Sequence, residues 1–361
     1  MKYSILSLII VSSFLSLKVE AQKYSNEFLS IGVGARAQAM GNAVVATTSG
    51  IYAGVWNPAG LATLKKEDGV QLGAMHAAWF GGVGNFDYLS FSLPTTQKGN
   101  RLAFSMVRFG IDQIPNTLSL YESDGSINFD NVREFSAVDY GFFGSYAKQL
   151  DKDKGPIRIG ASIKVIRRSI GPFANSFGFG ADIGIQMLRG KWTLAALAKD
   201  VTTTFNAWSF SFTDEEKDVL ALTNNEIPIK SVEITKPQLI LGAARSFKLS
   251  DNINLLSEVD LTFTTDGKRN TLLSADPISM DPSLGLEFSY KDFLSLRTGV
   301  NQFQRELNFD QKETLTFRPN LGLGLKLGKL LVDYAYTDLG SNQNTFSHVV
   351  SLRLGIKPRE H

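Results

Sequence analysis

Strict alternation of apolar with small or polar residues is clearest at residues 176–187, SFGFGADIGIQM. Side chains of a β-strand point alternately to its two faces. One face of this segment therefore carries only apolar side chains, and the other carries glycines, Asp182 and Gln186. The apolar face comprises Phe177, Phe179, Ala181, Ile183, Ile185 and Met187. The segment is predicted to be a β-strand with one apolar face.

The same alternation recurs from about residue 69 to the end of the chain. Residues 157–165 and 317–327 repeat it most clearly. Weaker copies bring the total to about fourteen predicted strands, at about 70–79, 85–94, 100–110, 135–150, 190–200, 236–248, 252–264, 282–291, 293–302, 329–337 and 345–356. A soluble β-sandwich alternates in the same way, so the pattern alone does not decide between water and lipid.

Connection lengths decide between the two. Tight turns are predicted at 95–99, 151–155, 189–190, 249–251, 291–292 and 328. The connections between them are mostly longer, at 111–134, 201–235, 264–280, 304–315 and 338–344, with 80–84 and 171–175 as brief members. Outer-membrane barrels have this arrangement, with short periplasmic turns and longer outer loops. Residues 69–361 are therefore predicted to form an all-β, transmembrane, antiparallel β-barrel of about 14 strands, integral to a Gram-negative outer membrane and in contact with its lipid.

The first 21 residues are predicted to be a secretory signal peptide. Lys2 precedes an apolar run at 5–17, and Val19-Glu20-Ala21 forms a small-x-small cleavage site. The apolar run is too short to cross a hydrocarbon core of about 30 Å as a helix.

Composition excludes several functional classes. The chain has 37 Lys and Arg against 35 Asp and Glu, so no basic surplus favours nucleic acid as a partner. It contains no Cys and only three His, which argues against a metal centre or a thiol nucleophile. No hydrolase, metalloprotease or phosphate-loop motif occurs in the sequence. We therefore expect no catalytic residue, no metal site, no cofactor and no enzyme activity.

The polar face of the predicted strands carries balanced charge. Six basic and five acidic residues fall on it: Arg158, Lys164, Arg297, Arg318, Lys326, Arg353, Asp182, Glu258, Asp260, Glu287 and Asp333. A balanced set predicts salt bridges inside the barrel rather than a selectivity filter. Glycines recur on the same face, at Gly178, Gly180, Gly184, Gly285, Gly299, Gly322, Gly324 and Gly355. Two explanations for them stay open, which are close approach of a segment packed inside and easing of barrel curvature.

A candidate to fill the lumen precedes the first predicted strand. The N-terminal plug or hatch segment is expected at 22–68. Residues 28–64 show no alternation, and contain a small-residue run at 32–41 followed by Trp56-Asn57-Pro58-Ala59-Gly60. Small residues suit a crowded lumen, so residues 28–64 are predicted to be a plug. Within it we expect Asn57 either to bond the barrel wall or to cap a plug turn, with Pro58 fixing φ.

The run FLSIGVGARAQAMGNAVVATTSGIYAGVWNPAGLA, residues 28–62, resembles the N-terminal hatch of the PorV/PorQ family. These are outer-membrane proteins similar to the FadL long-chain fatty-acid transporters. The plug motif is carried by Gly32, Gly34, Arg36, Gly41, Trp56, Asn57, Pro58, Ala59 and Gly60. The resemblance implies a FadL-like barrel with its hatch in the lumen. For PorV-like members it also implies a role in the type IX secretion system, beside a translocon subunit and cargo C-terminal signal domains.

The longest predicted outer loop, 201–235, is the candidate partner-binding element. It opens with Phe205, Trp208, Phe210 and Phe212, interpreted as an aromatic row that continues the seventh strand above the membrane. Thr213 and the glutamate three residues later predict a capping box that starts a short helix. The row either docks onto the translocon or cargo or completes the interfacial aromatic girdle.

Two function classes follow. The first, favoured by the resemblance, is a protein-binding barrel of the type IX secretion system. The second is a FadL-like outer-membrane transporter of hydrophobic small molecules such as fatty acids. Both need the same barrel and plug, so the sequence pattern does not separate them.

Overall fold

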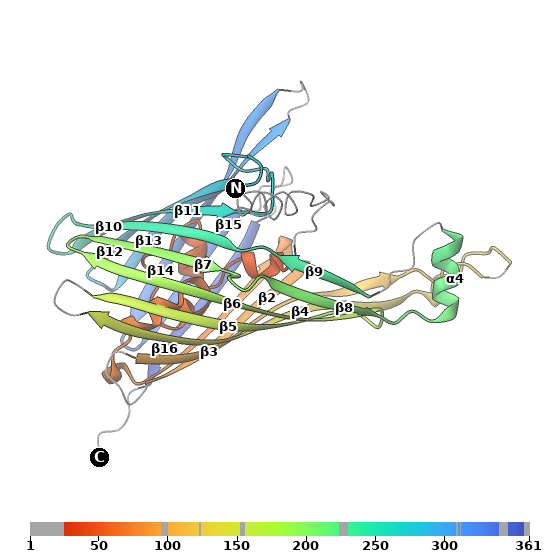
Figure 1. The fold of residues 1–361 in the computed structure, drawn as a ribbon, viewed down its shortest axis with the longest axis horizontal. Helices are drawn as coiled ribbons and strands as arrows, with labels where there is room; N and C mark the ends of the chain where they lie inside the picture. Colours follow the sequence, from red (N-terminus) through yellow and green to blue (C-terminus); the bar gives the residue numbers. More distant parts are fainter. Residues whose placement is uncertain are drawn as a thin grey trace, which may run out of the picture.

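The chain forms a closed antiparallel barrel (Figure 1). The computed structural model describes residues 25–94, 100–122, 124–151, 156–223, 230–307, 310, 312–338 and 346–356, so the predicted signal peptide lies outside the described residues. Each strand pairs with its neighbours, and the β5–β6 pairing closes the sheet on itself. The strands are β1 Val70–Trp79, β2 Gly84–Pro94, β3 Asn100–Asn116, β4 Arg133–Asp151, β5 Ile157–Ile170, β6 Ala174–Arg189, β7 Trp192–Lys199, β8 Thr204–Phe210, β9 Ser231–Thr235, β10 Gln238–Lys248, β11 Ile253–Thr264, β12 Ser279–Tyr290, β13 Leu294–Leu307, β14 Glu313–Leu327, β15 Leu330–Asp338 and β16 Phe346–Ile356.

Sixteen strand segments in the described residues make fourteen barrel strands. β7 and β8 both pair with β6, one with each half of it, so together they form one interrupted strand. β9 pairs with β8, and β10 pairs with β7, so β9 and β10 also form one interrupted strand. The first interruption coincides with positive φ at Asp200 and Thr203, which a regular strand does not allow. The prediction of about fourteen strands is therefore confirmed.

The two faces of the wall differ as the alternation predicts. Ile183 and Leu323 point outward and expose 54% and 46% of their surface. Their neighbours Gly184 and Gly322 point inward, against Asn57 and Ala39. Because exposed aliphatic and aromatic side chains cover the outside of most strands, the barrel surface matches a hydrocarbon environment.

The N-terminal segment lies inside the barrel. It comprises η1 Glu27–Ser30, α2 Ala35–Ala39, η2 Gly50–Tyr52, α3 Ala53–Trp56, η3 Pro58–Thr63 and η4 Lys66–Asp68, drawn in red and orange in Figure 1. Most of its side chains are buried against the wall.

Glycines of the wall make this packing possible. A Cβ on Gly160 would lie 2.4 Å from the Pro58 carbonyl carbon, and one on Gly299 would lie 2.1 Å from that of Met40. Gly184, Gly285 and Gly322 face plug atoms in the same way, whereas Gly178, Gly180, Gly324 and Gly355 face side chains of the wall. Close approach of a packed segment therefore explains about half of the inward glycines that the sequence singles out.

The outer ends of several strands are longer than predicted. β3 continues to Asn116, and β8 and β9 occupy much of the predicted loop 201–235. That loop carries α4 Asp214–Leu222, whose Thr213–Glu216 capping box is present. α4 and the connection from β3 to β4 reach the same end of the molecule, at the right of Figure 1. No helix in the described residues is long and apolar enough to cross a membrane.

Candidate functional site

Asn57 ties the plug to itself and to the wall. Its side chain is fully buried, and its Nδ2 donates to the carbonyls of Val45 (3.0 Å) and Ile185 on β6 (3.3 Å). Its Oδ1 accepts from the Ala59 N–H at 3.2 Å and caps η3, in which Pro58 is the first residue. Asn57 thus fills both of the roles between which the sequence left a choice. An Asx cap followed by Pro starts a helix because Pro has no N–H that would need a partner there.

The other plug-motif residues serve close packing. Trp56 donates its indole N–H to the Val33 carbonyl at 2.7 Å, and its ring lies over Gly32, where a Cβ would be 2.4 Å from ring carbon Cζ2. Gly32, Gly34 and Gly41 all have positive φ, which glycine adopts without a steric cost. A Cβ on Gly60 would lie 2.3 Å from the Thr48 carbonyl oxygen.

Arg36 joins the plug to an ion network on the wall. Its Nε lies 2.8 Å from Glu287 on β12, which also accepts from Arg297 on β13 at 2.6 Å. Arg297 in turn contacts Asp333 on β15 at 2.7 Å. On the opposite wall Lys164 contacts Asp182 at 2.8 Å and Asp200 at 2.5 Å. These contacts agree with the prediction of salt bridges inside the barrel.

Glu258 and Asp260 on β11 bind backbone N–H groups of the plug, which the sequence did not predict. Both are almost fully buried, yet neither has a basic partner among the salt bridges of the described residues. Asp260 accepts from the backbone N–H groups of Val44 (2.8 Å) and Val45 (2.9 Å). Glu258 accepts from those of Ala46 (2.7 Å) and Thr47 (3.2 Å), and from the Thr47 hydroxyl. Two carboxylates thus hold four consecutive peptide groups of the plug. We call this the plug latch.

A chamber of about 530 Å³ lies between the plug and the wall. Plug residues Leu29, Val55 and Trp56 supply an apolar side, together with Leu197 and Ile240 of the wall. Most of its remaining lining is polar. It comes from the plug, from β7, β10, β11, β12 and β13, and from the connection between β11 and β12.

The chamber borders a seam in the wall between β12 and β13. Their ladder ends at the Leu284–Val300 pair, although β12 begins at Ser279 and β13 continues to Leu307. β12 remains paired with β11 along this stretch, whereas the β13–β14 hairpin projects away from the barrel (Figure 1). Asp281, Ser283, Asn301, Gln302 and Gln304, which line the chamber, all lie along the seam.

Part of the β11–β12 connection fills this seam. Asn270 makes two hydrogen bonds to the backbone of Arg305 on β13, donating to its carbonyl at 3.0 Å and accepting from its N–H at 2.9 Å. Leu273 pairs with Met280 on β12 through two backbone bonds. We call residues 270–273 the seam wedge. They bond the free edge of β12 and the free edge of β13, where these two strands would otherwise pair with each other.

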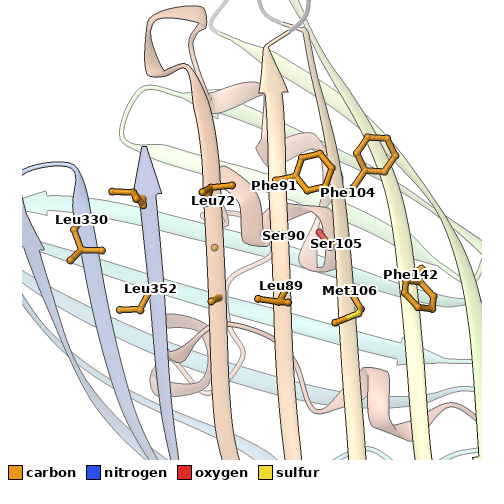
Figure 2. A pocket seen from close by; sticks show the side chains of 13 residues that line it. Leu72, Leu89, Ser90, Phe91, Phe104, Ser105, Met106, Phe142, Leu330 and Leu352 are labelled. Carbon is orange, nitrogen blue, oxygen red and sulfur yellow. The ribbon is translucent and has the colours of Figure 1, made fainter. Parts of the chain in front are cut away.

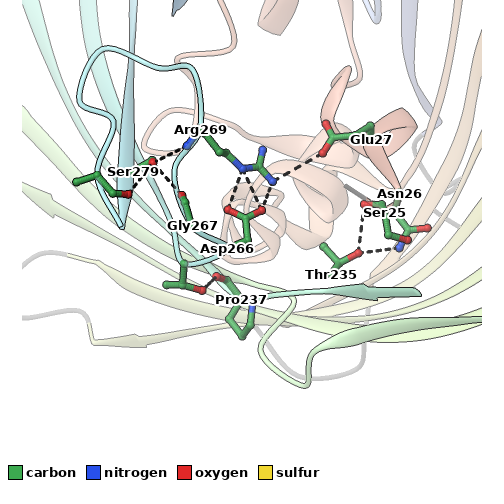
Figure 3. Close-up of polar contacts among 11 residues, drawn as sticks. Ser25, Asn26, Glu27, Thr235, Pro237, Asp266, Gly267, Arg269 and Ser279 are labelled. Atoms are coloured by element: carbon green, nitrogen blue, oxygen red, sulfur yellow. Dashed lines mark hydrogen bonds and ion pairs between the residues drawn. The ribbon is translucent and has the colours of Figure 1, made fainter. Parts of the chain in front are cut away.

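Arg269 anchors the wedge, as Figure 3 shows. Its guanidinium bonds Asp266 and reaches Glu27 of the plug at 3.9 Å, and its N–H donates to Ser279 Oγ at 3.0 Å. Partial burial alone raises the pKa of Asp266, but the hydrogen bond and charge of Arg269 outweigh it and hold that pKa below its usual range. Wedge and plug thus meet at one arginine.

A second hollow of about 610 Å³ lies on the lipid side of the wall (Figure 2). Outward side chains of β1 to β4, β15 and β16 surround it, among them Leu89, Phe91, Phe104 and Phe142. Its lining suits a lipid acyl chain.

The predicted aromatic row does not form one face. Phe205 and Trp208 are three residues apart, so the period of two places them on opposite sides of β8. Phe205 points outward, whereas Trp208 is buried, stacks on Phe210 and lies under the Arg168 guanidinium. Phe212 stacks on Phe173 instead. The interpretation as a single exposed row is wrong, although Phe205 and the loop around α4 remain accessible.

Comparison with solved structures identifies the same fold elsewhere. The toluene transporter TodX of Pseudomonas putida superposes with a TM-score of 0.57 at 14% identity, covering 93% of this chain and 100% of that one. The monoaromatic hydrocarbon channel CymD gives 0.56 at 14% identity, covering 94% and 100%. The toluene transporter TbuX of Ralstonia pickettii gives 0.50 at 13% identity, covering 90% and 98%. No protein-family profile and no curated protein sequence matches the chain.

These likenesses concern the fold. The chain has a FadL-like 14-strand barrel, as predicted, and its apolar outer surface is typical of barrels that span the Gram-negative outer membrane. The expectation that it is not an enzyme agrees with its structural neighbours, which are described as transporters and channels.

Proposed function

We propose that this barrel transports small hydrophobic or amphipathic molecules across the outer membrane, through the chamber beside the plug. One observation carries the proposal, which is that the chamber meets the wall where the β12–β13 ladder is replaced by the seam wedge. The hydrogen bonds of a β-ladder support one another along the two strands. The wedge, by contrast, holds β13 through one side chain, that of Asn270. The wall is therefore weakest beside its own internal cavity.

The depth of the seam suits entry from the outer leaflet. From Tyr290 at the periplasmic turn, β12 runs six residues to Leu284, where the ladder ends. At roughly 3.3 Å per residue and a tilt of about 40°, this is a height of about 15 Å. An apolar band is about 25 Å tall, so the seam begins within its outer part. Phe317, beside the seam on β14, exposes 52% of its surface there.

The test locks the seam with a disulfide. The chain has no Cys, so the pair Ser283→Cys and Asn301→Cys, one step beyond the last ladder pair, supplies the only thiols. Cells with the oxidised pair should lose uptake of radiolabelled toluene or decanoate and regain it on reduction. The control pair is Ser289→Cys and Ser295→Cys, whose hydroxyls already lie 3.3 Å apart within the intact ladder. Uptake that is unaffected by the oxidised seam lock contradicts the proposal.

A second candidate is the protein-binding component of a type IX secretion system. It rests on the resemblance over residues 28–62 and on apolar side chains at the outer end of the molecule. Leu222 of α4 exposes 83% of its surface, and Phe129 and Tyr121 in the β3–β4 connection expose 75% and 67%. Exposed apolar side chains that gather into a patch are typical of interaction sites. Replacing all three by Ser should abolish co-purification of a translocon subunit or cargo domain while leaving uptake intact. Full partner recovery from that variant removes this candidate.

A further inference from the structure

Two further cavities continue from the chamber toward the periplasm. The first, of about 250 Å³, shares Trp56 with the chamber. The second, of about 400 Å³, lies at the periplasmic rim and shares Ser49, Leu331 and Arg353 with the first. The cavities therefore form a series in which Trp56 and then Arg353 stand at the junctions.

Arg353 has no counter-ion at its junction. It forms no salt bridge and no hydrogen bond in the part of the chain that the structure describes. The acidic residues that line these two further cavities already have partners. Glu287 binds Arg36 and Arg297, Asp333 binds Arg297, and Asp68 accepts the Lys65 N–H at 2.7 Å. The guanidinium is left with five donors and no acceptor.

The backbone makes room for this side chain. Arg353 Nη1 lies 2.8 Å from the position a Cβ would take on Gly50, whose φ is +69°. A side chain at residue 50 would therefore displace the guanidinium from the junction.

The charges around the junction favour an anion. Five basic residues line the two cavities that meet at Arg353: Arg36, Arg297, Arg353, Lys326 and Lys329. Three acids line them, Glu287, Asp333 and Asp68, which leaves two positive charges in excess. The chamber differs, because Glu27, Asp260 and Asp281 there exceed Lys199 and Arg269 by one negative charge. An anionic group is therefore attracted to the periplasmic side of the plug.

We propose that Arg353, with Lys326 and Lys329, forms an oxyanion-binding site at the periplasmic mouth, which takes the carboxylate or phosphate group of a small solute. The planar guanidinium matches both groups with paired donors, and the two lysines add attraction at the rim. The idea that a transported solute leaves through this site rests on the proposed function. The binding of an anion at the site does not depend on it.

Calorimetry on the full chain in nonionic detergent tests this site. Titrations use sodium butyrate, inorganic phosphate and the neutral isostere butyramide. Wild type should bind at least one of the two anions, with an affinity that falls as salt rises, and should ignore butyramide. Arg353→Gln should weaken that binding by about tenfold or more. The control Lys291→Gln, at an exposed periplasmic turn outside both cavities, should bind as wild type does.

The outcomes separate the site from transport. Saturation by butyrate identifies a carboxylated solute, and saturation by phosphate alone identifies a phosphorylated one. Either sustains the site. Equal binding by wild type and Arg353→Gln, or equal affinity for butyrate and butyramide, overturns it. If the seam lock leaves uptake unchanged while anion binding still depends on Arg353, the proposed function fails and the site stands.

Discussion

The plug latch makes a quantitative prediction for Glu258→Ala. This change removes the acceptor of two plug N–H groups, those of Ala46 and Thr47. A buried donor left without a partner costs about 1–3 kcal/mol. Ala46 is buried and Thr47 is partly exposed, so water replaces the acceptor at Thr47 but not at Ala46. The docked plug should therefore lose about 1–3 kcal/mol, which raises the undocked fraction by roughly 5- to 150-fold.

Planar-bilayer recording measures that fraction directly. Wild-type protein should give no large steady conductance because the plug fills the lumen. Glu258→Ala should open to a large conductance far more often. Glu258→Gln is the matched control, because its amide oxygen still accepts both N–H groups, and its openings should stay within about tenfold of wild type. Heat-modifiable migration on gels confirms that each barrel has assembled.

The opposite result is equally plain. A correctly assembled Glu258→Ala barrel that stays as closed as wild type means that these contacts do not hold the plug. Equal opening by the Ala and Gln variants means that the negative charge, rather than the hydrogen bonds, is what matters.

Three further predictions concern the wall, the plug and the seam. Ile183→Arg, on the lipid face, should cost about 2–4 kcal/mol in barrel stability, whereas Gly184→Arg should act through the plug at Asn57; equal loss of heat-modifiable barrel in both would mean that inside and outside are reversed. Deletion of residues 28–64 should create a large steady conductance in bilayers, and a closed deletion variant would show that another element blocks the lumen. Asn270→Ala should raise uptake and speed amide hydrogen exchange at Arg305, since two bonds of about 0.5–1.5 kcal/mol each are lost, while unchanged exchange there would mean that the wedge does not hold β13.

Periodicity was enough to predict the wall. A one-residue error in register would have turned Ile183 inward, and it points outward with more than half of its surface exposed. The strand interruption after β7 was missed because it breaks the period. Positive φ at Asp200 and Thr203 shifts the chain, so Phe205 and Trp208 no longer follow the phase of the preceding strand. A non-alternating spacing of three between two aromatic residues was the available signal.

Contacts between distant segments were harder to predict. The alternation placed Glu258 and Asp260 on the inner face correctly, but a pattern of charges suggests only charged partners. Their partners are backbone N–H groups more than 200 residues earlier in the chain, and every residue type except proline supplies such a group. The plug motif showed that a segment was packed inside, without indicating which part of the wall would hold it.

The seam was also beyond reach of the pattern, although one residue pointed to it. Pro282 lies in β12 at the level where pairing with β13 has stopped, and proline cannot donate a ladder bond. Alternation continues on β12 past this level, because it reports which face is buried and not whether neighbouring strands are bonded. On β13 it is broken beyond Asn301, where Gln302 has positive φ and the pairing with β14 shifts register. Asn270 lies in a connection whose conformation no periodicity describes.

The latch and the seam share one physical property. In both, side chains bond backbone groups of another segment: Glu258 and Asp260 bond the plug, and Asn270 bonds β13. A ladder opens cooperatively, since each strand residue is held by its neighbours on both sides. The side-chain amide of Asn270 is held by its two bonds to the Arg305 backbone and by the neighbouring Arg269. These two bonds therefore break and re-form without opening the pairing of β11 or β14. Because the Arg269 carbonyl accepts the Thr271 N–H of the wedge and its guanidinium reaches Glu27 of the plug, release of the wedge weakens a plug contact at the same time. The places where this barrel yields most easily are therefore the seam and the plug, which lie on two sides of the same chamber.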